Sequence, residues 1–280
     1  MVVRMITAIV ALLVFLGILI AAHFVPVIFP AAAAILCAIG VYEMLHCCGV
    51  HRKWGSALPL LLCSLAPLAA FHWPFPLLLG SNATGGMIFL TLYLFTYLVF
   101  KRGKSSPQEI AVPFFCCFYI IAAFTSIVLL RVGLEDGKYV YLISFVGAWV
   151  TDTFAYFCGR LFGKHKLIPE ISPKKTVEGS IGGIIFCILS MLLYGWIVQR
   201  ISGGTVEANY LMLAVSGLFI SFVSQIGDLC MSAIKRTYGI KDFGKLFPGH
   251  GGVLDRFDSV LAVTLVLVLV TSFGSLFQIV

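Results

Sequence analysis

Nine long apolar stretches dominate this chain of 280 residues and restrict the folds that it can adopt. Each approaches the ~20 residues with which an α-helix crosses the hydrocarbon core of a bilayer. Backbone polar groups in lipid must be satisfied internally, and the stretches are too long for barrel strands. The sequence therefore predicts an all-α fold, a polytopic membrane bundle of about nine transmembrane helices. The predicted spans lie near residues 4–22, 25–46, 56–72, 84–100, 109–131, 138–160, 180–199, 208–234 and 257–279.

The composition agrees with a membrane environment. Hydrophobic residues make up 60% of the chain and charged residues 11%, whereas soluble domains average about 25% charged residues. The first stretch could pass for a signal peptide, but another apolar run follows at once and no soluble domain does, so we interpret it as a retained helix. The nine cysteines form no CxxC pair and mostly lie in apolar runs, which is typical of small packing residues rather than a disulfide framework or a zinc site.

The net charge of +7 is distributed unevenly over the loops, and 16 of the 19 Lys and Arg residues fall on one predicted side. The positive-inside rule then predicts a cytoplasmic N-terminus, an external C-terminus and an odd number of helices in the cytoplasmic membrane. This one-sided pattern favours a membrane topology signal over nucleic-acid binding. The cytoplasmic set is Arg4, Arg52, Lys53, Lys101, Arg102, Lys104, Arg160, Lys164, Lys166, Lys174, Lys175, Lys235, Arg236, Lys241, Lys245 and Arg256; the external set is Arg131, Lys138 and Arg200.

Ionisable residues divide the chain into two parts. The first four predicted helices contain almost none beyond Glu43, whereas the last five contain Asp152, Asp228 and Asp258 at or near their ends. We therefore predict an N-terminal scaffold over residues 1–104 and a C-terminal catalytic half over residues 105–280. The boundary falls in the loop KRGKSSPQE, whose Ser and Pro residues indicate a break.

The run from Ser232 to Asp258 holds most of the charge of the C-terminal half. It combines a glycine-rich PGHGG turn with five cations and three carboxylates, between two predicted spans. Cations with scattered carboxylates at a membrane face suit a polyphosphate that is held through a divalent metal. The cations are Lys235, Arg236, Lys241, Lys245 and Arg256, and the carboxylates are Asp242, Asp255 and Asp258.

Asp228 is the strongest single candidate for a functional role. It lies seven residues before Lys235, roughly 10 Å along the helix from its cytoplasmic end. An ionisable residue at that depth is costly and is a functional candidate by default, although a structural salt bridge to a neighbouring helix is the alternative. Ser224, Ser232 and Lys235 recur with it at helical spacing and share its face.

The other carboxylates suit Mg²⁺, which takes one or two protein carboxylates together with substrate phosphates. Asp255 and Asp258 have i,i+3 spacing and share a face if the last helix begins by Asp255. A charge favoured by the helix dipole explains one of them, but not the neighbouring PGHGG turn. Asp152 is compatible with two roles, a metal ligand or a residue that positions Arg160 or a lysine.

Two further segments have both a functional and a structural interpretation. In SPKKTVEGS, Lys174 and Lys175 precede Gly179 at a helix start, where free N–H groups can hold a phosphate, although lysine pairs in cytoplasmic loops are more often topology signals. Gly179 and Gly183 form a GxxxG pair, which usually indicates helix packing. His250 lies between two glycines, on a turn near the predicted metal.

These motifs resemble those of the phosphatidate cytidylyltransferases, also called CDP-diacylglycerol synthases. The resemblance covers most of residues 150–260 and rests on four runs, with no departure at a motif position. They are SAIKRTYGIKDFGKLFPGHGGVLDRFD, QIGDLCMS, DTFAYFCGRLFGKHK and SPKKTVEGS. The family joins CTP to phosphatidate, giving CDP-diacylglycerol and pyrophosphate in the first committed step of CDP-diacylglycerol-dependent phospholipid synthesis. The resemblance also implies Mg²⁺, a second cation such as K⁺, and a homodimer.

The resemblance implies a site at the cytoplasmic interface, where cytosolic CTP meets phosphatidate of the membrane lipids. Asp228 and Asp255 would hold Mg²⁺, with Asp152 and Asp258 as further candidates. Asp228, Asp255, Lys235 and Arg256 would be the catalytic set. Lys174, Lys175, Lys235 and Arg236 would neutralise CTP phosphates, and Lys241, His250 and Arg256 would bind the lipid phosphate. The alternatives are a transporter of an anionic solute and a cytidylyltransferase that uses another lipid phosphate.

Overall fold

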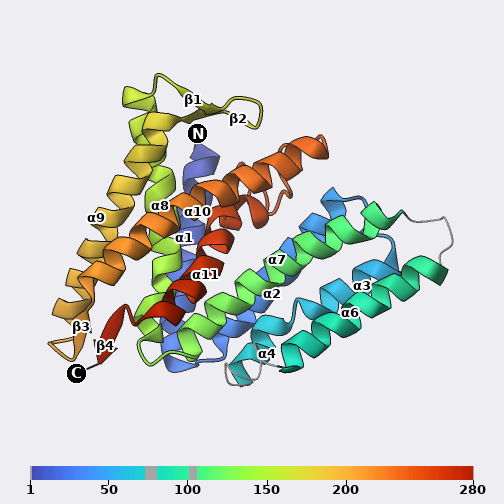
Figure 1. Ribbon diagram of the computed structural model, residues 1–280, viewed down its shortest axis with the longest axis horizontal. Coiled ribbons are helices and arrows are strands. Elements are labelled where there is room, and N and C mark those ends of the chain that lie inside the picture. Colours follow the sequence, from blue (N-terminus) through green and yellow to red (C-terminus); the bar gives the residue numbers. More distant parts are fainter. Residues whose placement is uncertain (1, 73–80, 101–105, 280) are drawn as a thin grey trace. The chain divides into compact units, whose positions relative to one another are not determined.

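The computed structural model describes residues 2–72, 81–100 and 106–279, and most of them are helical (Figure 1). The first part of the chain forms α1 (Val2–Phe24), α2 (Ile28–Cys47), α3 (Trp54–Cys63), α4 (Ala66–His72), α6 (Ser81–Phe100) and α7 (Pro107–Val132). The second part forms α8 (Gly137–Phe162), α9 (Val177–Ile201), α10 (Tyr210–Thr237) and α11 (Leu254–Phe273). Four short strands complete it: β1 (Lys166–Ile168), β2 (Ser172–Thr176), β3 (Val206–Ala208) and β4 (Phe277–Ile279). The predicted helical membrane fold is confirmed.

Eight candidate membrane spans occur in the described residues, and each overlaps a predicted stretch. The remaining predicted stretch, 84–100, lies in α6, whose apolar part Leu90–Phe100 is shorter than a full span. The predicted span 56–72 is broken into α3 and α4. Pro67 explains the break, because its ring lacks an N–H and clashes with the carbonyl four residues earlier, at Cys63, where α3 ends.

The described residues pack as two compact units. Among the described residues, the first comprises 2–72, 81–100, 106–129 and 238–256, and the second comprises 130–237 and 257–279. The predicted boundary at residues 104 and 105 lies outside the described residues, as do Lys101, Arg102 and Lys104 of the topology argument. The predicted division into scaffold and catalytic half therefore stays a prediction.

In the second unit, α8 and α9 pack closely and antiparallel through glycines. A Cβ on Gly179 would overlap the Ala155 carbonyl, and one on Gly183 would lie 3.1 Å from the Thr151 carbonyl and 3.3 Å from Ala155 Cβ. Small residues let helix backbones approach in lipid, where burial of apolar surface does not drive association. The predicted packing role of the GxxxG pair is confirmed.

Two antiparallel ribbons, which the sequence analysis did not predict, lie at opposite ends of α9 (Figure 1). The β1–β2 hairpin precedes α9 and carries Lys174 and Lys175. The β3–β4 ribbon pairs Val206–Ala208 with Phe277–Ile279 and lies near the end that carries Arg200. The hairpin therefore holds the basic SPKK segment against the start of α9.

Candidate functional site

An ion pair between Lys175 and Asp228 forms the centre of the candidate site in the second unit. Lys175 Nζ lies 2.6 Å from Asp228 Oδ2, and each side chain is about a quarter exposed. Lys175 also donates to the Gln225 carbonyl at 3.5 Å, and Ser232 Oγ donates to Asp228 Oδ1 at 3.4 Å. The structure thus joins residues from two predicted runs. The pair is compatible both with a phosphate site and with the structural salt bridge considered above.

Two more predicted carboxylates belong to the same unit and lie near Asp228. Asp258 is within electrostatic range of Asp228, Asp152 and Lys235. Asp152 Oδ2 accepts a hydrogen bond of 2.8 Å from Ser259 Oγ, and Asp258 Oδ1 accepts one of 2.9 Å from the Ser259 N–H. Residues from α8, β2, α10 and α11 therefore bring three carboxylates and two lysines together.

The close approach of α10 and α11 depends on Gly227, directly before Asp228. A Cβ at this position would lie 2.5 Å from Ala262 Cβ and 3.0 Å from the Asp258 carbonyl oxygen. Hence the glycine of the QIGD motif sets the spacing that brings two carboxylates of neighbouring helices together. Any larger residue here would separate the helices.

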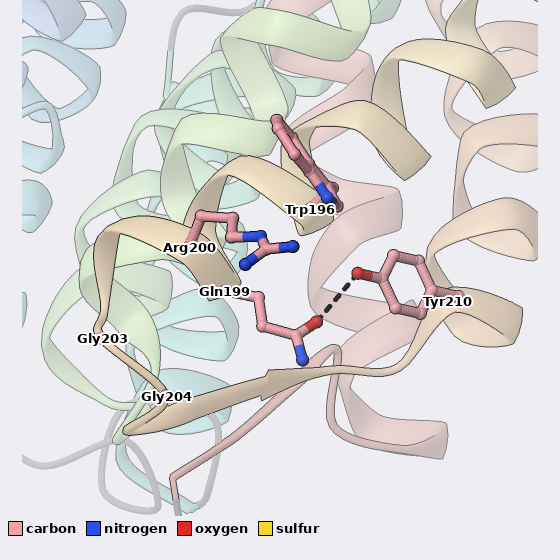
Figure 2. A pocket seen from close by; sticks show the side chains of 6 residues that line it. All are labelled: Trp196, Gln199, Arg200, Gly203, Gly204 and Tyr210. Carbon is pink, nitrogen blue, oxygen red and sulfur yellow. Dashed lines mark hydrogen bonds between the residues drawn. The ribbon is translucent and has the colours of Figure 1, made fainter.

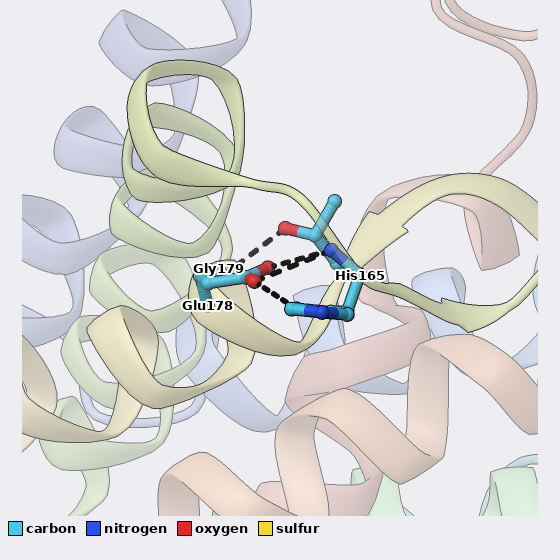
Figure 3. Close-up of polar contacts among 4 residues, drawn as sticks. His165, Glu178 and Gly179 are labelled. Atoms are coloured by element: carbon cyan, nitrogen blue, oxygen red, sulfur yellow. Dashed lines mark hydrogen bonds and ion pairs between the residues drawn. The ribbon is translucent and has the colours of Figure 1, made fainter.

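The start of α9 is held by local contacts, as Figure 3 shows. Thr176 is the N-cap, and its Oγ1 accepts the Gly179 N–H at 3.1 Å. The Glu178 carboxylate lies 2.7 Å from His165 Nδ1 and accepts the His165 N–H, while the Val177 N–H donates to the His165 carbonyl. Two donors of the first helical turn are therefore already used, so the predicted phosphate role of this segment depends on Lys174 and Lys175 rather than on the Gly179 N–H.

In the first unit, Asp255 is buried and braces the glycine-rich loop. Its Oδ2 accepts the N–H of Phe243 at 2.8 Å and the N–H of Gly252 at 2.9 Å. The Phe247 N–H donates to the Gly251 carbonyl and closes the turn that carries His250. His250 Nδ1 is buried and has no hydrogen-bond partner among the described residues. Asp255 thus has a structural role beside its predicted metal role.

Several predicted cations lie on exposed side chains. α11 begins at Leu254, so Asp255 and Asp258 do have helical spacing. Within the described part of the chain, no group of three His, Cys, Asp or Glu side chains has metal-binding spacing. The exposed cations are Lys174, Arg236, Lys241 and Arg256, and Lys235 is half-buried.

A cavity of about 570 Å³ lies at the opposite end of α9 and is separate from this cluster (Figure 2). Tyr210 Oη donates to Gln199 Oε1 at 2.8 Å, and the Arg200 guanidinium lies 5.7 Å from the Trp196 ring centre. α9 has 25 residues, which is roughly 37 Å at 1.5 Å per residue. The cavity is therefore too far from Lys175 to belong to the same site. It is lined by Trp196, Gln199, Arg200, Gly203, Gly204 and Tyr210.

Two residues with contacts in these clusters were not assigned a role from the sequence. Ser259 carried no signal in the sequence. Glu43 did carry one, as an isolated ionisable residue within an apolar helix. Its two oxygens accept the N–H groups of Val253 and Leu254 in the first unit.

Comparison with known proteins shows the family to which the chain belongs. The model of the cytidylyltransferase family matches residues 2–273. A phosphatidate cytidylyltransferase of Staphylococcus haemolyticus is 34% identical over 266 residues, which cover 93% of this chain and 95% of that protein. Those of Staphylococcus saprophyticus and Staphylococcus aureus are 36% and 35% identical, with the same coverage. The chain belongs to the cytidylyltransferase family.

Proposed function

We propose that this membrane protein is a phosphatidate cytidylyltransferase, which converts CTP and phosphatidate into CDP-diacylglycerol and pyrophosphate. The observation that carries the proposal is the charge cluster around Lys175 and Asp228. It combines the family's QIGD and SPKK motifs in a chain whose similarity to phosphatidate cytidylyltransferases extends over 93% of its length.

In the proposed reaction, a phosphate oxygen of phosphatidate attacks the α-phosphorus of CTP. The new phosphorus–oxygen bond forms as the bond between the α-phosphorus and the bridging oxygen breaks, and pyrophosphate leaves with that oxygen. The attacking phosphate is already anionic near pH 7, so no strong general base is needed. The protein must neutralise charge and align the two phosphates. Lys175, Lys174, Lys235 and Arg236 would supply positive charge to CTP and pyrophosphate.

The carboxylates near Lys175 fit a magnesium ion. Asp228 and Asp258 come from neighbouring helices, and Asp152 is within electrostatic range of Asp258. Mg²⁺ uses only one or two protein carboxylates beside phosphates and water, so a cage of three protein ligands is not required. We propose Asp228 with Asp258 as its holders, and Asp255 and Asp152 remain further candidates. When bound, the ion would neutralise phosphate charge.

Orientation follows from the loop charges. Lys175 and Arg160 lie at one end of the antiparallel pair α8–α9, and Lys138 and Arg200 lie at the other. We propose that the first end faces the cytoplasm, where CTP is available.

A reporter that is active only outside the cytoplasm is expected to be active when it is fused after residue 280. Activity of a cytoplasmic reporter at the same position would contradict the odd helix count.

The two groups of cations are expected to serve different substrates. Lys175→Ala should mainly raise the apparent KM for CTP, and Arg256→Ala should mainly impair use of phosphatidate. A cation raises affinity for the phosphate that it touches, and screening limits its reach to roughly 10 Å at 0.1 M salt. The measurement varies CTP and the surface fraction of lipid separately in detergent micelles. Equal effects of both variants on both substrates would reject this division, though not the cytidylyltransferase assignment itself.

The test of the function itself is incorporation of radiolabelled CTP by the purified protein, with a panel of lipid phosphates. Labelled CDP-diacylglycerol formed from phosphatidate supports the proposal. A product from another lipid phosphate alone would indicate a related cytidylyltransferase. Absence of any lipid product, together with flux of an anionic solute in vesicles, would favour a transporter. A second cation such as K⁺ and a homodimer are further proposals, which cation dependence and mass in detergent would test.

A further inference from the structure

Glu43 is a buried carboxylate that the reaction proposed above does not use. Glu43 lies in α2, and only 6% of the residue's surface is exposed. Burying a carboxylate is costly unless hydrogen bonds compensate for the lost water. A carboxylate kept at such a position therefore points to a specific partner.

The partner is the start of α11, which follows the PGHGG turn. Glu43 Oε1 accepts the Val253 N–H at 3.0 Å, and Oε2 accepts the Leu254 N–H at 2.9 Å. α11 begins at Leu254, and the first N–H groups of a helix have no acceptor within the helix. A negative charge at this end is also favoured by the helix dipole. Glu43 thus caps α11 from a helix about 210 residues earlier in the chain.

Two glycines of the loop leave the space that this carboxylate occupies. A Cβ on Gly244 or on Gly252 would overlap the Glu43 carboxylate, and at Gly252 the three nearest atoms all belong to Glu43. Gly252 does not have a positive φ, so the restriction there is space rather than backbone conformation. Both glycines are therefore matched to the presence of Glu43.

Asp255 holds the same segment by two further bonds, from Phe243 and Gly252. Two carboxylates together thus accept four backbone N–H groups between residues 243 and 254. These four donors are therefore occupied by protein acceptors and are not free for a substrate phosphate. The geometry of Arg256 then depends on how firmly this loop is held.

We infer that Glu43 is a positioning residue of the reaction, which fixes the loop of residues 243–255 and the start of α11 without touching substrate. This inference rests on the proposed function, since the loop carries His250 and leads into Arg256, the predicted contacts of the lipid phosphate. Through Glu43, the N-terminal half of the chain then contributes to the reaction.

The first experiment compares Glu43→Ala and Glu43→Gln with the full-length protein in detergent. The control is Glu109→Gln, which removes a carboxylate from the exposed pair with Lys53 and leaves the loop untouched. Both Glu43 variants are expected to lower kcat at least about tenfold, which corresponds to ~1.4 kcal/mol. Amide hydrogen exchange in peptides over residues 243–256 should be faster at the same time, with other peptides unchanged.

The second experiment uses the space argument. Gly252→Ala should lower kcat strongly in the wild-type background and have little further effect in the Glu43→Ala background, because the atoms that it would overlap are then gone. Additive losses from the two substitutions would overturn the assignment. So would faster exchange in the loop with unchanged kcat, which would reduce Glu43 to a purely structural residue.

Hydrogen exchange separates this inference from the proposed function. If the wild-type protein makes no CDP-diacylglycerol but Glu43→Ala loosens residues 243–256, the loop contacts stand and the proposed function fails. If the wild-type protein is active and neither exchange nor kcat responds to Glu43→Ala, the inference fails and the function stands.

Discussion

Asp228→Asn is expected to remove nearly all turnover while the fold persists. The amide is close in shape but cannot supply the negative charge that both Lys175 and a bound Mg²⁺ require. Activity is measured as labelled CTP incorporated into lipid, and folding by size-exclusion profile and thermal unfolding. Glu207→Gln in β3, at the other end of α9, is the matched control and should retain wild-type activity. Retention of more than about a tenth of the activity, a loss below ~1.4 kcal/mol, would exclude Asp228 as an essential ligand.

A double variant separates the two roles of the ion pair. Removing one partner of a partly buried pair leaves an uncompensated charge, whereas removing both is often nearly neutral for stability. Asp228→Asn with Lys175→Gln is therefore expected to restore thermal stability to near the wild-type level without restoring turnover. Recovery of activity in the double variant would show that the pair is a structural salt bridge only.

Asp255→Ala and Asp255→Asn are expected to remove nearly all turnover as well, but with different effects on the loop. The Ala variant loses the acceptor of the Phe243 and Gly252 N–H groups, so hydrogen exchange there should become faster. The Asn variant keeps one carbonyl oxygen that can accept these bonds while it loses the charge, so exchange should stay close to wild type.

The contrast between these two variants tests the metal role of Asp255. If Asp255→Asn retains more than about a tenth of the activity, which corresponds to a loss of transition-state stabilisation below ~1.4 kcal/mol, bracing of the loop is the main role of Asp255. Loss of turnover in both variants, with normal exchange in Asp255→Asn, would support the charge as a second requirement beside the bracing contacts.

The fold class was predictable because lipid imposes strong local requirements. A run such as 180–199 must be helical wherever it packs, since its backbone has no water to bind. The broken span at Pro67 and the ribbons were less predictable. The strands have three to five residues each, and an alternation of polar and apolar residues over so short a run does not indicate a strand. The pairing of β3 with β4 also joins segments about 70 residues apart in the chain.

The candidate site was predictable residue by residue but not as an arrangement. The depth of Asp228 in an apolar helix marked it in the sequence, as did the position of Asp258 after the glycine-rich turn. The sequence suggested that the Gly179 N–H could hold a phosphate. In the structure, Thr176 Oγ1 accepts this N–H instead. Capping by a neighbouring hydroxyl is a common use of such a residue, and only the geometry shows which acceptor is closest.

The sequence by itself determined the membrane environment, the helical class and the residues that can carry phosphate chemistry, because hydropathy and charge are properties of each segment alone. Tertiary structure decided which of them meet. Lys175 reaches Asp228 because glycines bring α8, α9 and α10 close together. Glu43 reaches the start of α11 because Gly244 and Gly252 leave room for it. Such contacts depend on the space between segments far apart in the chain, and that space is set only when the helices pack.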